Sequence, residues 1–308
     1  MILRLILGLL CAFSLFAQTP LPPPPLAHIV LLGDPHLPGK RFEQKETILQ
    51  TINHWDDVTM VVALGDLCEK TGSQEEYEIV KNYFSKLKHP LKVITGNHDF
   101  IYDDIPDSQG QLKHASKEIQ QQKLDFFKKS FGLEHLYYSI EQSPYLLIFL
   151  SADDPKHLAQ ISKEQIAWLK KTLEENSKKP TIIFFHAPLE RTLDNYHKWI
   201  NTPDFVAQPL EDIKSIILQN PQAILWASGH THTSFERSRL LSTEYTFYEQ
   251  AIFNLHNSDL NKEEIVTRSL LLYPDRIVIK AYNHAQNRWI EDTEPFLMLN
   301  NIHWQRRP

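Results

Sequence analysis

Residues 29–36 read IVLLGDPH, so four apolar residues lead directly into an aspartate and a histidine. Short apolar runs bounded by a turn-forming glycine are typical of buried β-strands. Four more apolar runs end in residues that can bind metal ions: 60–64 before Gly65 and Asp66, 92–95 before Gly96, Asn97, His98 and Asp99, 182–185 before His186, and 223–228 before Gly229, His230, Thr231 and His232. This repeated pattern predicts one functional site built from strand ends.

Segments with helical spacing of apolar residues alternate with these runs, which predicts crossovers feeding a largely parallel sheet. In open sheets of this kind, ligands collect at the carboxyl ends of the strands, so five such ends can converge on one crevice. Ser162 and Gln165 form an expected capping box before an apolar stripe. The expected helices are 42–54, 74–87, 115–131, 163–176 and 210–218.

Beyond His232 the pattern changes to β-rich runs, which predicts a second and more antiparallel sheet. Residues 137–140 and 145–151, joined by a turn at 142–144, are expected to begin that same sheet. Two sheets with helices outside both predict a single α/β domain over residues 27–308. The C-terminal runs are 245–252, 269–273 and 277–282.

The candidate ligands comprise three oxygen donors and four imidazoles, which are too many for one zinc-like ion and suit two ions sharing a carboxylate. Two such ions acidify a water between them into a nucleophile suited to in-line attack on phosphorus. One residue separates Asp34 from His36 and His230 from His232, and in an extended segment residues i and i+2 face one ion together. The seven candidates are Asp34, His36, Asp66, Asn97, His186, His230 and His232.

The motifs together, in their order along the chain, resemble the calcineurin-like metallophosphoesterases: Asp-x-His, Gly-Asp, Gly-Asn-His-Asp, a lone histidine after an apolar strand, and Gly-His-Thr-His. Each motif alone is weak, but the ordered set from residue 34 to residue 232 is specific. The resemblance implies a four-layer αββα sandwich of two mixed β-sheets flanked by helices. With histidines at positions 36 and 98, the chain resembles the cyclic nucleotide phosphodiesterase-like branch of the family. Repair nucleases and sphingomyelinase-like enzymes share the same two histidines.

The same resemblance implies a role for each candidate residue. His98 would contact the substrate phosphate together with Asn97 and protonate the leaving oxygen, and Asp99 would orient His98 by a hydrogen bond. A hydroxide bridging the two metals would be the nucleophile. One metal would be held by Asp34, His36 and His232, the other by Asn97, His186 and His230, and Asp66 would bridge them.

Two positions depart from relatives of this family. Purple acid phosphatases carry a tyrosine ligand where this chain has Glu69, and they lack the histidine supplied by His36, so a tyrosinate–iron site is not expected. Many relatives read His-His-Pro where this chain has His186, Ala187 and Pro188. The cofactors are expected to be two divalent or trivalent ions, and manganese, iron and zinc all suit imidazole and carboxylate donors.

We therefore expect a hydrolase for a small-molecule phosphate ester, and we favour a diester over a monoester as its substrate. A nuclease of the same fold is an alternative that the formal net charge of −6 disfavours. It would be favoured by clustering of Lys113, Lys117, Lys123, Lys128 and Lys129 on one helix face. A metal-free binding scaffold is a further alternative, but it predicts missing ligands, and none is missing.

The N-terminus reads as a targeting segment, because Arg4 precedes the apolar run 5–17 and a proline-rich stretch follows. Residues 1–18 are the expected signal peptide and residues 19–26 a linker, which predicts a secreted or periplasmic protein without a membrane span in the mature chain. An uncleaved N-terminal anchor is the alternative. Cys68 is then the single remaining cysteine, which favours a thiol that is buried near the metal site.

Residues 100–135 form a polar segment inserted directly after the third ligand cluster, and it contains Tyr102 and His114. Its position suits a cap that overhangs the site and shapes substrate access. A solvated connector without contact to the ligand is equally compatible with its composition.

Overall fold

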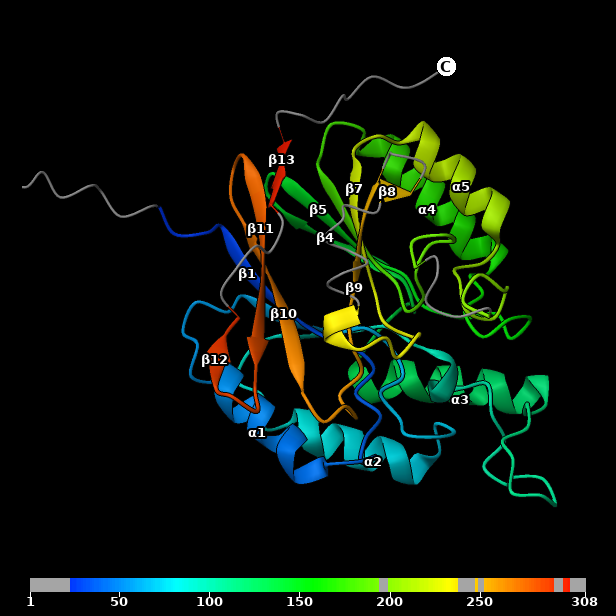
Figure 1. Cartoon of the computed structure of the whole chain (residues 1–308). Helices are drawn as coiled ribbons and strands as arrows, with labels where there is room; N and C mark the ends of the chain where they lie inside the picture. Colours follow the sequence, from blue (N-terminus) through cyan, green and yellow to red (C-terminus); the bar gives the residue numbers. More distant parts are fainter. Residues whose placement is uncertain (1–22, 194–198, 238–246, 249–251, 291–295, 300–308) are drawn as a thin grey trace, which may run out of the picture.

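The computed structural model describes residues 23–193, 199–237, 247–248, 252–290 and 296–299. The expected signal peptide 1–18 and the first part of the linker 19–26 lie outside them. No helix among the described residues has the length and apolar character that a membrane crossing requires. The elements stack as helices, sheet, sheet and helices (Figure 1), which confirms the predicted αββα architecture.

The first sheet combines parallel and antiparallel strands. Its order is β12 (Arg288–Trp289), β11 (Arg276–Asn283), β10 (Val266–Leu272), β1 (Ala27–Leu32), β2 (Met60–Ala63) and β3 (Leu91–Val93), and β13 (Phe296–Met298) also pairs with β11. Strands β1, β2 and β3 are parallel to one another, whereas β10 is antiparallel to β1. The carboxyl ends of β1, β2 and β3 therefore lie at one edge.

The second sheet has a parallel centre between antiparallel edges. Its order is β4 (Tyr138–Gln142), β5 (Tyr145–Phe149), β6 (Thr181–Phe184), β7 (Ala223–Ser228), β9 (Ile252–His256) and β8 (Phe247–Tyr248). The sequence-based division of strands was wrong: β4 and β5 share a sheet with β6 and β7, whereas β10 and β11 extend the sheet of β1. The physical reason is that β5 reaches β6 through a helical crossover, and the β10–β11 hairpin pairs with the open edge of β1.

The five expected α-helices are all present among the described residues and cover the outer faces of the two sheets. They are α1 (Phe42–Ile52), α2 (Gln74–Phe84), α3 (Lys117–Phe131), α4 (Lys163–Glu175) and α5 (Leu210–Gln219). In Figure 1, α1, α2 and α3 lie beside the first sheet, and α4 and α5 lie beside the second. Each predicted helix thus exists, with ends that differ by a few residues.

Strand β1 illustrates why the apolar runs are continuous. Ile29 and Leu31 pack into the core between the two sheets, whereas Val30 and Leu32 pack under the helices. Because both faces of the sheet are covered, every position of the strand is buried, and alternation with polar residues is absent. The candidate ligands Asp34, Asp66 and His186 follow such covered strands and are themselves buried.

Helix α4 begins at the predicted position but with different hydrogen bonds. Ser162 Oγ accepts the backbone N–H of Gln165, as an N-cap does. The reciprocal bond of the expected capping box is absent, because the Gln165 amide bonds both backbone groups of Ser151. The N–H of Ser162 instead donates to the Asp153 carboxylate at 2.6 Å.

Candidate metal centre

The first group of candidate ligands contains Asp34, His36 and His232, whose donor atoms lie within 4.8 Å of one another. Asp34 and His36 follow β1, and His232 follows β7, so the two sheets contribute jointly. His36 Nε2 lies 2.9 Å from His232 Nε2, and His232 Nε2 lies 3.6 Å from Asp34 Oδ2. These side chains converge from positions almost 200 residues apart, as the motif order predicted.

The second group contains Asp66, His186 and His230, and all three are buried. His186 Nε2 lies 3.0 Å from His230 Nδ1 and 3.2 Å from Asn97 Oδ1. Asn97 is the first residue of a 3₁₀ turn (Asn97–Asp99), which begins four residues after the end of β3. Its amide oxygen therefore joins the second group as a fourth possible donor.

Asp66 lies between the two groups. Its Oδ2 atom is 3.3 Å from His186 Nε2 in the second group and 3.7 Å from His36 Nε2 in the first. Its Oδ1 atom accepts the backbone N–H of His98 at 2.8 Å. This placement suits a carboxylate shared by two ions.

Backbone carbonyls fix the tautomers of three histidines. His36 and His186 each present Nδ1 to a carbonyl oxygen, that of Cys68 at 3.3 Å and that of Leu64 at 2.8 Å. His230 instead presents Nε2 to the carbonyl of Asp204 at 2.7 Å, which leaves Nδ1 for the site. In the neutral form of each imidazole the nitrogen that faces the group carries no proton, as a metal ligand requires.

The backbone at the candidate ligands is not extended. Asp34, His36, Asp66, His230 and His232 all have positive φ angles, between 35° and 67°. Residues other than glycine seldom adopt this region, and such strain concentrates at functional sites. The expectation that His230 and His232 address one ion was wrong, because this bend in the chain directs them to different groups.

Two glycines permit the close approach of the ligand loops. A Cβ atom on Gly96 would lie 2.3 Å from Asp66 Oδ1, and one on Gly229 would lie 2.2 Å from Asp34 Oδ1. Real carbon atoms do not come that close, so any side chain at either position would displace a candidate ligand.

Burial and neighbouring charges set the protonation of the cluster. Burial lowers the pKa of His36 and of His230 to about 3, so both imidazoles are neutral at physiological pH. Burial also opposes ionisation of Asp66, but the charges of His186 and His98 outweigh it and hold its pKa well below the ordinary value. Burial opposes the charge of His186 as well, but the Asp66 carboxylate outweighs burial and raises the pKa of His186 to about 9. His36 and His230 are thus neutral, whereas His186 and Asp66 form a buried ion pair.

His98 and Asp99 occupy different environments. His98 is half-buried, and its Nδ1 donates to the carbonyl of Lys70 at 2.7 Å. The expected hydrogen bond from Asp99 to His98 was wrong, because the Asp99 carboxylate accepts the backbone N–H groups of Cys68 and Gly96. Asp99 therefore ties two ligand loops together and leaves the orientation of His98 to Lys70.

The inserted segment 100–135 reaches the site through its stem. Tyr102 pairs with His114 in an isolated antiparallel bridge, and the residues between them extend away from the fold as an exposed loop. The Tyr102 hydroxyl accepts the Asn97 side-chain N–H at 3.3 Å. The stem thus contacts a candidate ligand, whereas the tip, including Ile105, is solvent-exposed.

Three features of the site have no counterpart in the sequence motifs: the carbonyl acceptors of the histidines, the hydroxyl of Tyr102, and the buried ammonium group of Lys45. Every residue carries a carbonyl, so the sequence contains no signal for the acceptors. Lys45, however, lies three residues before Ile48 and seven before Ile52, on the apolar face of its helix. A lysine at this spacing is a signal for a buried cation.

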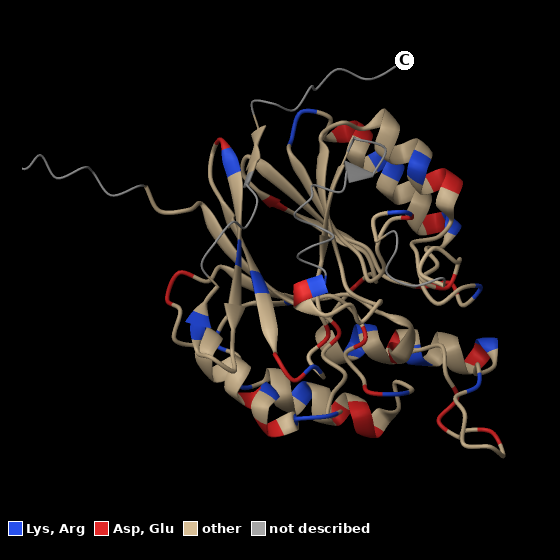
Figure 2. Cartoon of the chain, in the orientation of Figure 1, with Lys and Arg blue, Asp and Glu red and all other residues tan. Residues whose placement is uncertain are grey.

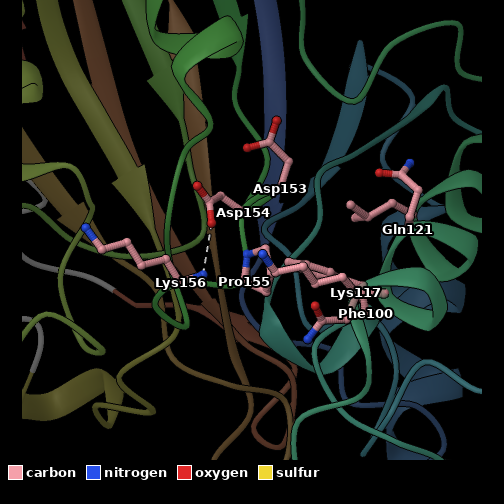
Figure 3. A pocket seen from close by; sticks show the side chains of 9 residues that line it. Phe100, Lys117, Gln121, Asp153, Asp154, Pro155 and Lys156 are labelled. Carbon is pink, nitrogen blue, oxygen red and sulfur yellow. Dashed lines mark hydrogen bonds between the residues drawn. The ribbon is translucent and has the colours of Figure 1, made fainter.

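A hollow of about 470 Å³ lies between α3 and the loop after β5 (Figure 3). Its acidic groups are already engaged, since Asp154 accepts the N–H of Lys156 and Asp153 binds Ser162. Gln120 on the helix side donates to the carbonyl of Ile101. The carboxylates of the hollow are therefore engaged within the protein, and the polar groups left to face a ligand include the ammonium groups of Lys117 and Lys156.

The donor set fits two metal ions. Two nitrogens each about 2.1 Å from one ion are roughly 3 Å apart when they subtend a right angle at it. The facing pairs His36–His232 and His186–His230, at 2.9 and 3.0 Å, match this spacing. Buried carboxylates without a cation are costly, so positive charge between the two groups would stabilise the fold.

Comparison with known protein families and sequences also indicates a phosphoesterase. A family model described as "Calcineurin-like phosphoesterase" matches residues 27–234. The chain is similar to a probable glycerophosphodiester phosphodiesterase GpdQ from Arcobacter nitrofigilis, with 25% identity covering 66% of this chain and 71% of the relative. It is also similar to the 3′,5′-cyclic adenosine monophosphate phosphodiesterase CpdA from Escherichia coli K12, with 21% identity covering 86% of this chain and 92% of the relative.

Comparison with solved structures supports the fold. A dimetal phosphatase from Danio rerio superposes with a TM-score of 0.57 and 14% sequence identity, covering 84% of this chain and 97% of the other. At this identity the likeness concerns the arrangement of helices and strands. The αββα layers therefore agree with an independent structure.

Proposed function

Because this chain belongs to the calcineurin-like phosphoesterase family, we propose that it hydrolyses a small phosphodiester with the aid of two metal ions. The observation that carries the proposal is the convergence of two ligand groups, with Asp66 of the second group also 3.7 Å from His36 of the first. When bound, two such cations supply positive charge that acidifies a water nucleophile and neutralises phosphate oxygens. The donor types suit manganese, iron or zinc.

His98 is the general acid in this proposal. Its Nδ1–H donates to the Lys70 carbonyl, so Nε2 is the nitrogen available to a leaving-group oxygen. The loop that contains Lys70 is held in turn by the Glu76 carboxylate, which accepts the N–H groups of Lys70 at 2.7 Å and Gly72 at 3.0 Å. When both ring nitrogens carry protons, His98 would hand the Nε2 proton to the departing alcohol and keep the Nδ1 proton on the Lys70 carbonyl, a contribution typically worth about 10²–10⁴ in rate.

A diester is favoured over a monoester by the two relatives described above, since one is named as a glycerophosphodiester phosphodiesterase and the other as a cyclic nucleotide phosphodiesterase. Both names denote cleavage of one of two ester bonds on a single phosphorus. Discrimination between diester types depends on the surroundings of the site, where the described chain offers the hydroxyl of Tyr102.

A nuclease would need a continuous basic surface, and the lysines around α3 do not provide one. Three of the five candidate lysines are paired with aspartates, Lys113 with Asp103, Lys123 with Asp104 and Lys128 with Asp125, which leaves Lys117 and Lys129. In Figure 2, acidic and basic residues alternate along the described helices. Without a row of free cations, attraction for a polyphosphate backbone is weak.

The test is a substrate panel combined with metal analysis. Phosphodiesters, phosphomonoesters and pyrophosphates are assayed with the purified wild-type protein and with the Asn97→Ala and His98→Ala variants. We expect two metal ions per wild-type chain and faster hydrolysis of a diester. His98→Ala should keep both ions and lose about 10²-fold or more in kcat, whereas Asn97→Ala should reduce the bound metal.

The matched control is His135→Ala, because His135 is exposed and belongs to neither ligand group. This variant should retain both the metal and the activity. Hydrolysis that survives both Asn97→Ala and His98→Ala at the wild-type rate would rule out the proposed chemistry.

A further inference from the structure

Tyr102 enters the site from the inserted segment and is held there by its backbone. The carbonyl of Tyr102 accepts the buried ammonium group of Lys123 at 2.7 Å. The neighbouring Ile101 carbonyl accepts the N–H of Ala115 at 2.8 Å, next to the bridge between Tyr102 and His114. These bonds fix the stem of the insertion, so the phenol has a defined place beside the ligand loop.

The hydroxyl of Tyr102 accepts a hydrogen bond from the protein but donates none to a described residue. Its oxygen accepts the side-chain N–H of Asn97 at 3.3 Å, and Asn97 is its one hydrogen-bond partner among the described residues. A phenol has one proton and can accept as well as donate, so an accepted bond leaves the proton free for another acceptor. A phenol is protonated at neutral pH, so the group can act as a donor.

The phenol lies beside the two residues at which a phosphate would be expected. Its ring centroid is 5.1 Å from that of His98. Asn97, to which its hydroxyl is bonded, places its amide oxygen 3.2 Å from His186 Nε2 in the second ligand group. Tyr102 is only partly buried, so one side of the residue remains accessible to a ligand.

We propose that Tyr102 is a substrate-binding residue whose hydroxyl donates a hydrogen bond to a non-bridging oxygen of the bound phosphate ester. The inference rests on the proposed function and adds to it a role for the inserted segment. A hydrogen bond to an anionic oxygen is stronger than one between neutral groups, because the acceptor is charged. The insertion thereby takes part in holding the phosphate as well as shaping access to it.

The experiment compares wild type with Tyr102→Phe, which keeps the ring and removes the hydroxyl. Metal content is measured first, then the binding of inorganic phosphate to the metal-loaded protein by calorimetry, and finally kcat and KM for the diester that the wild type cleaves. We expect two ions per chain in both proteins and phosphate affinity reduced about 10-fold or more in the variant. The matched control is Tyr273→Phe. Tyr273 directly follows β10, which is antiparallel to β1, so it lies near the start of β1 and away from the ligands that follow that strand. This variant should bind phosphate as the wild type does.

Each other outcome has a definite meaning. Equal phosphate affinity in wild type and Tyr102→Phe would overturn the role of Tyr102 and leave the proposed hydrolase intact. Loss of one ion from the variant would also overturn it, because the hydroxyl would then serve to orient Asn97. A metal-loaded wild type that neither binds phosphate nor cleaves any ester would overturn the proposed function together with this inference.

Discussion

Lys45 occupies a position that is unusual for a lysine, with its side chain fully buried beneath the first ligand loop. Its ammonium group donates to the carbonyls of Pro35 and His36, both at 2.8 Å, to that of Pro38 at 3.2 Å, and to Asn261 Oδ1 at 2.7 Å. Burial lowers its pKa to about 8. These four oxygens replace water around the charge, and in return the charge fixes the strained backbone at His36.

We expect Lys45→Met to weaken metal binding at the first group. The variant keeps the apolar stem but leaves three carbonyls without their donor, at a cost of about 1–3 kcal/mol for each unsatisfied group. The loop would relax, and affinity at Asp34, His36 and His232 should fall more than affinity at the second group. Metal titration by calorimetry checks this.

The control for this change is Lys86→Met, which breaks an exposed pair with Glu46 that is worth at most about 1 kcal/mol. It should leave both metal affinities unchanged. Two equally strong metal sites in Lys45→Met would show that Lys45 does not position the loop.

The individual candidate ligands could be predicted because each polar residue follows a continuous apolar run in the sequence. Asp34 and His186, for example, each follow a strand in which every residue is buried. The carbonyl partners of the histidines could not be predicted, because the acceptor depends on how Leu64 and Asp204 lie in space. The role of Asp99 was misjudged for the same reason, since its partners Cys68 and Gly96 belong to two different loops.

The start of helix α4 is bonded to the largely buried carboxylate of Asp153. Both oxygens of Asp153 accept bonds from Ser162, one from its N–H and one from its hydroxyl. Burial nevertheless raises the pKa of Asp153 to about 6. The folded state therefore binds this proton more tightly than the unfolded chain, in which the pKa is near its ordinary value of 3.8.

The stability contributed at Asp153 should fall as the pH rises from about 4 to 6 and stay constant above that window. Replacing it in Asp153→Asn removes the ionisation, so the variant should gain stability relative to wild type across this window, by roughly 3 kcal/mol at most. The two proteins should have similar stability near pH 4. Urea unfolding of both proteins in chelator, at a series of pH values, measures the difference.

An exposed aspartate supplies the comparison for this series. Asp56→Asn changes the charge by the same amount away from α4. If wild type and Asp153→Asn keep a constant difference in the free energy of unfolding from pH 4 to 7, the Asp153 carboxyl does not titrate in that range.

At the scale of elements, helices were easier to predict than the distribution of strands. The helix α3 ends at Gly132, whose backbone is left-handed, and such a local signal is readable from the sequence. Membership of a sheet is not local. Nothing within 145–151 states that it pairs with β6, and nothing within 269–273 states that it pairs with β1.

The whole molecule is organised around a site that both sheets share. Asp34, Asp66 and Asn97 follow strands of the first sheet, whereas His186, His230 and His232 follow strands of the second. Each ligand group contains residues from both sheets. Ions held there would connect the two halves of the sandwich at one edge, so binding and the relative position of the sheets are coupled.

The central claim is that two cations lie side by side with Asp66 between them. X-ray diffraction from crystals of the metal-loaded protein, with anomalous data collected at the absorption edge of the bound metal, locates the ions directly. We expect two peaks roughly 3.5–4 Å apart, one within bonding distance of Asp34, His36 and His232 and the other of Asn97, His186 and His230, with Asp66 touching both. A single peak, or peaks bound to residues outside this set, would contradict the account.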